Sequence, residues 1–119
     1  MDPIQQQIFN FLNPHRRNLP ESLVRAIAGN ITFLIKYTAG PALKPENFTV
    51  TVIDVRGLRN EDVGHKATVC FHDGPGKFAV VICKQVKWGE NVLMGLMEKV
   101  DKAVKEILAK ERNDGCGDF

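Results

Sequence analysis

The chain of 119 residues is long enough for one domain with a sizeable core. Its composition, 44% hydrophobic and 25% charged, is that of an ordinary globular protein and excludes disorder over most of the length. A formal net charge of +2 is too small to indicate a nucleic-acid or membrane partner by itself. We therefore expect a single domain over residues 1–112 and a flexible C-terminal tail over residues 113–119.

The sequence also bounds where the protein acts. The first residues lack the basic stretch and unbroken apolar run of a signal peptide. The longest apolar region, residues 23–38, is too short and too often interrupted by polar residues to span a bilayer. Three cysteines form an odd set without close spacing, which is typical of reduced intracellular thiols. These features predict a cytoplasmic protein that does not enter a membrane.

Two helices are expected at the N-terminus. Over residues 3–12, Asp2 can cap the helix and Pro3 suits its first position. The second helix, over residues 20–38, carries an apolar stripe at three- and four-residue spacing and ends before Gly40-Pro41. Gly29 lies inside it, where it can permit close packing or divide the helix.

Three strands follow. The first, over residues 47–55, alternates so that apolar residues occupy one face and Thr49, Thr51, Ile53 and Val55 the other. The second covers residues 65–72. A proline- and glycine-rich turn over residues 73–77 then predicts an antiparallel hairpin with the third strand.

The third strand begins with Phe78-Ala79-Val80-Val81-Ile82-Cys83, which is apolar on both faces. Such a run predicts cover on both sides of the sheet. Pairing Phe71 with Phe78, and Val69 with Val80, would make one face a ladder of large apolar pairs. This register places Cys70 and Cys83 on the other face but not directly opposite, so we expect no disulfide between them.

The last element is a helix over residues 90–110, with an apolar stripe from Leu93 to Leu108. The order α-α-β-β-β-α predicts an α+β fold, in which a three-stranded antiparallel meander is packed by a long C-terminal helix. We expect the second and third helices to share one face of the sheet.

No catalytic, cofactor-binding or metal-ligating signature stands out, and none is predicted. Zinc-ligand spacing is absent from Cys70, His72, Asp73 and Cys83. The glycine-rich turn precedes a strand, whereas a phosphate-binding loop would precede a helix. Acidic residues and a histidine do gather around the first connection, but the local sequence is typical of a solvated loop. They are Asp54, Glu61, Asp62 and His65.

The second face of the sheet is where function is expected. The N-terminal helix or a second copy of the chain can cover it, and apolar patches on soluble proteins mark contact sites. We interpret the protein as a non-enzymatic interaction or regulatory module that forms a homodimer through its sheet. The candidate interface residues include the single tryptophan, because tryptophan is enriched at contact hot spots. They are Thr51, Ile53, Val81, Cys83 and Trp88.

Two alternatives stay open. A basic surface made by Arg16, Arg17, Lys84 and Lys87 would bind nucleic acid weakly. A small enzyme with an unrecognised site is the second alternative, and a defined cleft with converging polar groups would support it.

Overall fold

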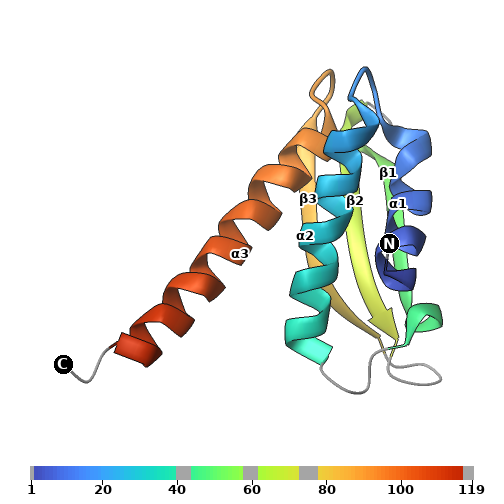
Figure 1. Cartoon of the computed structure of the whole chain (residues 1–119). Coiled ribbons are helices and arrows are strands. Elements are labelled where there is room, and N and C mark those ends of the chain that lie inside the picture. The colour runs from blue at the N-terminus through green and yellow to red at the C-terminus, as the bar shows by residue number, and fades with distance from the viewer. Residues whose placement is uncertain (1, 40–43, 58–61, 73–77, 117–119) are drawn as a thin grey trace.

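The computed structural model describes residues 2–39, 44–57, 62–72 and 78–116. Its elements follow the predicted order α-α-β-β-β-α, and the fold is α+β (Figure 1). The three α-helices are α1 (Pro3–Leu12), α2 (Glu21–Ala39) and α3 (Val92–Cys116). The three strands are β1 (Phe48–Arg56), β2 (Asp62–His72) and β3 (Phe78–Lys87). Two short 3-10 turns, Asn13–His15 and Pro45–Asn47, precede α2 and β1.

The N-terminal helices form for the reasons that the sequence indicates. The Asp2 side chain accepts a hydrogen bond of 2.8 Å from the backbone N–H of Ile4 and so caps α1. Gly29 does not divide α2, which is continuous. A Cβ atom at Gly29 would lie 3.3 Å from Nε2 of Gln5, so the glycine lets α1 and α2 approach closely.

The strands form the predicted antiparallel meander, with β2 between β1 and β3. The predicted register of the hairpin is wrong. Val69 pairs with Ile82 while Cys70 pairs with Val80, so Val81 is an extra residue in β3. Phe71 pairs with Ala79, so the register already differs from the prediction by one residue before the bulge, and the bulge adds a second. Local alternation reveals neither shift. The turn over residues 73–77 lies outside the described residues.

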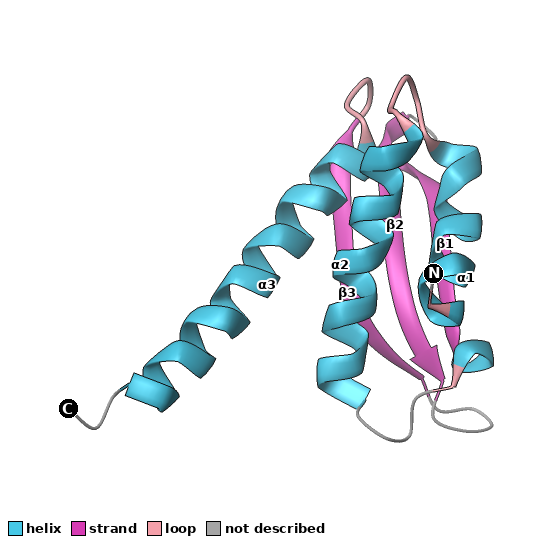
Figure 2. Ribbon diagram, in the orientation of Figure 1, coloured by secondary structure: helices cyan, strands magenta, loops and turns pink. Residues whose placement is uncertain are grey.

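All three helices lie on the same side of the sheet (Figure 2). The expected packing of α2 and α3 on one face is confirmed, and α1 joins them beside β1. The alternative in which α1 covers the opposite face is wrong. Within this chain the predicted cover on both faces of β3 is also wrong, because Val80 is 54% exposed. We call the sheet side that faces away from the helices the open face.

The core lies between the helices and the inner face of the sheet. The fully buried side chains come from all three helices and the central strand, which shows that one apolar layer joins them. The largest of these are Ile8, Leu12, Ile27, Ile31, Ile35, Leu93, Leu96, Val24, Val69 and Val100.

Helix α3 is longer than its apolar packing requires. Its first half is buried up to Val100, whereas Leu108 is 47% exposed and the C-terminal half extends away from the sheet (Figure 1). The helix runs to Cys116, past the start of the expected tail at residue 113. In the part of the chain that the structure describes, no helix combines the length and hydropathy needed to cross a membrane.

Candidate functional site

The open face is the first candidate site. Two complete rows of paired residues there carry no charged side chain. The next rows along the strands contain Lys66 and Lys87, and at the other end the His72 ring lies 3.3 Å from Oγ1 of Thr49. The two rows are Thr49, Cys70 and Val80, and Thr51, Thr68 and Cys83. Ile53 continues the apolar character of β1 and is 54% exposed. No described helix covers these side chains.

The structure brings together three of the five predicted interface residues. Thr51, Ile53 and Cys83 share the open face. Val81, at the bulge, is half-buried and packs against the core. Trp88 lies beyond the end of β3, where its ring stacks on that of His65 with 4.9 Å between centroids.

The second candidate site is built around His65. Its side chain is on the inner face of β2, directly opposite Asp54 of β1, and only 6% of the residue is exposed. The His65 Nδ1 and Asp54 Oδ1 atoms are 2.8 Å apart. Because an ionised carboxylate only accepts hydrogen bonds, we assign the donor proton to Nδ1.

The other ring nitrogen of His65, Nε2, is buried and has no hydrogen-bond partner among the described residues. A buried polar atom without a partner costs about 1–3 kcal/mol, so its presence calls for an explanation. The interpretation of this region as a solvated loop is wrong for His65. The strand β2 begins at Asp62, and alternation from Ala67 places His65 on the inner face. Glu61 lies outside the described residues.

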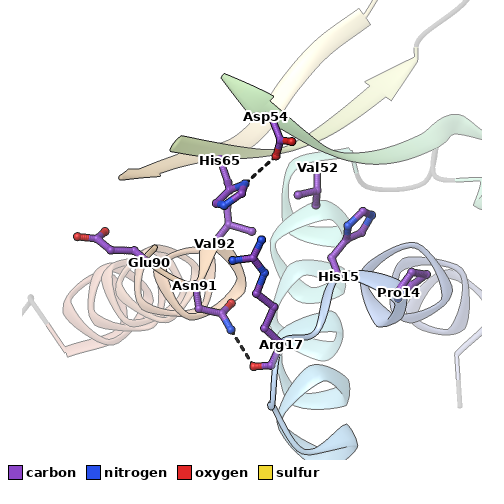
Figure 3. Close-up of a pocket in the computed structure, with 9 residues that line it drawn as sticks. All are labelled: Pro14, His15, Arg17, Val52, Asp54, His65, Glu90, Asn91 and Val92. Atoms are coloured by element: carbon purple, nitrogen blue, oxygen red, sulfur yellow. Dashed lines mark hydrogen bonds and ion pairs between the residues drawn. The ribbon is translucent and has the colours of Figure 1, made fainter. Parts of the chain in front are cut away.

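A cavity of about 390 Å³ opens beside this pair (Figure 3). Its walls come from the loop after α1, from the sheet and from the start of α3. The lining residues are Pro14, His15, Arg17, Val52, Asp54, His65, Glu90, Asn91 and Val92. The cavity therefore combines an apolar wall with side chains of both charges.

Asn91 fixes the position of two of these walls. Its Oδ1 accepts from the backbone N–H of Leu93 at 2.9 Å and so caps α3. Its Nδ2 donates to the carbonyl oxygen of Arg17 at 3.1 Å (Figure 3). The loop that carries Arg17 is thereby held against the start of α3.

The two predicted basic residues of β3 do not share one face of the sheet. Lys84 points to the helix side of β3, where its side chain would lie 3.3 Å from a Cβ at Gly95. Lys87 is on the open face, and Arg16 and Arg17 belong to the loop after α1. Alternation along β3 separates the two lysines, because residues an odd number apart on a regular strand face opposite sides. Nucleic-acid binding stays a prediction.

The cysteines of the sheet are free thiols in the structure, and Cys70 and Cys83 are both half-buried on the open face. Searching the described ranges for three or more clustered His, Cys, Asp or Glu side chains finds no group that could hold a metal ion. Comparisons of the chain with protein-family models, with curated proteins and with solved structures found no match.

Proposed function

We propose that this protein is a self-associating interaction module, in which two copies pack together through the open faces of their sheets. The observation that carries the proposal is the pair of uncharged rows on a sheet face that none of the described helices covers. A two-fold dimer brings the same patch of both copies into contact, so a patch without charge meets no like charge.

The composition of the open face suits such a contact. Its threonines, valine and cysteines are small or β-branched and leave a nearly flat surface, which a second sheet can approach to about 10 Å. Val80 and Ile53 are each 54% exposed and would lose that exposure in the dimer. Removing apolar surface from water supplies the driving force.

Face-to-face packing fits better than pairing through the edge of β3. Lys99 of α3 donates a hydrogen bond to the carbonyl oxygen of Cys83 in that strand. Lysine beside a sheet edge opposes the addition of another strand, because a partner backbone would displace the charged group. The edge is therefore partly occupied, whereas the open face is not.

The dimensions of the sheet predict a weak dimer. Three strands at about 4.8 Å spacing and nine residues at about 3.3 Å each give at most roughly 400 Å² per copy, an area that includes the rows of Lys66 and Lys87. Two such faces bury roughly 800–900 Å² in total, which is below the usual range for stable complexes and typical of transient ones. We expect a dissociation constant of about 10–500 μM.

Sedimentation equilibrium over about 1 to 1000 μM protein tests the proposal. The wild-type protein is expected to change from monomer to dimer over this range. Val80→Lys and Thr51→Lys place a like charge on each copy of the contact and are expected to remove the dimer. Circular dichroism checks that both variants keep the fold, which is expected because both side chains are exposed.

Phe11→Lys is the matched control. Phe11 is 40% exposed on α1, on the helix side of the molecule. This variant is expected to dimerise like the wild type. A wild-type protein that stays monomeric at the highest concentration would refute the proposal. So would a dimer that survives both open-face substitutions.

A further inference from the structure

The cavity beside His65 has the composition of a ligand site. Of the charged groups that line it, the Arg17 guanidinium has no ion pair or hydrogen bond with any described residue, while His65 uses one ring nitrogen and leaves the other unpartnered. Figure 3 shows the Arg17 side chain extending from its loop towards His65 and Asp54. Both residues line the same cavity, and each has a nitrogen group without a partner among the described residues.

We propose that this cavity binds a small organic monocarboxylate, with the ligand's carboxylate held between Arg17 and Nε2 of His65. A guanidinium matches a carboxylate in geometry and can donate two parallel hydrogen bonds to it. In the complex, Nε2 carries a proton and donates to the ligand, while Nδ1 donates to Asp54. The imidazolium then lies between two carboxylates and donates one hydrogen bond to each.

The His65 ring and the backbone of Arg17 are held in place before a ligand arrives. Asp54 orients the His65 ring through the 2.8 Å contact, and Trp88 stacks on the ring. The backbone of Arg17 is tied to Asn91. An anion can reach the buried Nε2 only after side chains around it move, and the Arg17 side chain is free to do so because no described residue pairs with it. A ring and a loop backbone that are held in this way lower the entropy cost of binding.

The charges of the lining favour a monoanion over a phosphate dianion. Asp54 and Glu90 line the same cavity as Arg17, His15 and His65, so an added double negative charge would be opposed by two carboxylates. A ligand with one negative charge meets about half of that repulsion and still pairs with Arg17.

The remaining walls favour an apolar body on the ligand. Pro14, Val52 and Val92 supply carbon surface. The cavity volume of about 390 Å³ lies within the range of pockets that hold small organic molecules. An inorganic anion would bind only at the charged end of the cavity and would leave its apolar wall exposed to water.

Benzoate is a suitable probe, because it joins one carboxylate to a flat apolar ring. For its nine non-hydrogen atoms we expect a dissociation constant of about 1 mM in a calorimetric or NMR titration. Benzamide has the same shape without the charge, and inorganic phosphate has the charge without the ring. Both are expected to bind at least about ten-fold more weakly. The ¹⁵N resonance of His65 Nε2 is expected to shift with benzoate and to stay unchanged with benzamide.

Two adjacent arginines provide a matched pair of variants. Arg17→Gln is expected to weaken benzoate binding about ten-fold or more, because it removes the guanidinium. Arg16→Gln removes the same charge from a neighbouring exposed residue that does not line the cavity, and is expected to bind benzoate like the wild type. Both substitutions are on an exposed loop, so the fold is retained.

Three results would overturn the proposal. The first is the absence of benzoate binding up to about 20 mM in the wild type. The second is equal weakening by Arg16→Gln and Arg17→Gln, which would indicate general surface charge. The third is phosphate or benzamide binding as tightly as benzoate, which would remove the monocarboxylate as the ligand class. None of these results depends on whether the open face dimerises.

Discussion

Gly95 gives the sharpest test of how α3 is packed on the sheet. It lies in the buried first half of the helix, and a Cβ atom there would be 2.7 Å from Cγ1 of Val86 in β3. Valine is stiff about χ1, so this methyl group cannot easily turn away. Gly95→Ala therefore has two opposing effects on stability: the helix propensity rises, and the contact with Val86 becomes overpacked.

The two effects differ in magnitude. Replacing glycine by alanine inside a helix gains about 1 kcal/mol. Overpacking of a close-packed contact costs about 1–3 kcal/mol. We expect Gly95→Ala to lower the free energy of unfolding by about 1 kcal/mol in total, which corresponds to a fall of about 0.5–1 M in the urea midpoint.

Gly29→Ala is the matched comparison, because Gly29 is also inside a helix. Its nearest neighbour is Nε2 of Gln5 at 3.3 Å, the far end of a flexible side chain that can move by a few tenths of an ångström. The propensity gain is then retained, and we expect Gly29→Ala to raise the unfolding free energy by up to about 1 kcal/mol. The two substitutions should have opposite signs.

Urea unfolding followed by circular dichroism, with all variants at one protein concentration, measures both effects. The double variant Val86→Ala/Gly95→Ala identifies the cause. With the Val86 methyl group removed, Gly95→Ala should become stabilising relative to Val86→Ala alone. If Gly95→Ala destabilises equally in both backgrounds, the contact between α3 and β3 is not its cause and the packing argument fails.

Two further predictions concern helix starts. The Lys36 ammonium, with a smaller contribution from the Ile4 N–H, lowers the pKa of Asp2 below 3.8. The ionised carboxylate therefore adds its full stability above pH 3.8, and this stability is lost as the pH falls through the lowered pKa. Asp2→Asn keeps the cap acceptor but removes the charge. At pH 6 it should be less stable than the wild type by under about 1 kcal/mol. Urea titrations at each pH should show that this difference in stability shrinks below about pH 4. Asn91→Ala should lower the free energy of unfolding by about 1–2 kcal/mol, because it removes the α3 cap. Asn91→Asp keeps the cap acceptor and should lower it by less. Equal losses of stability would show that the hydrogen bond to the Arg17 carbonyl matters more than the cap.

The element order could be read from the sequence because it depends on local periodicity. The stripe from Leu93 to Leu108 has the helical spacing, and Thr49 to Val55 alternates, whatever the rest of the chain does. The caps at Asp2 and the proline at residue 3 act within one turn, so the start of α1 was also predictable.

The bulge at Val81 could not be predicted from local sequence patterns. All six residues from Phe78 to Cys83 are apolar, so any register would have satisfied the pattern. The pairing is decided by which side chains reach the core between the sheet and the helices. The helices cover one face of the sheet and leave Val80 54% exposed on the other. This also follows from how the three helices pack together.

The His65 cavity depends on tertiary structure even more strongly. Alternation sets the faces of Asp54 and His65, but only strand pairing places them 2.8 Å apart. Arg17 and Asn91 come from distant parts of the chain. They meet because α1 ends, and α3 begins, at the same end of the sheet (Figure 1). The sequence alone thus determined the helices, the strands and their apolar faces, since each follows from interactions over a few residues. The tertiary structure decided the open face, the bulge and the cavity, because these depend on which distant surfaces exclude water from one another.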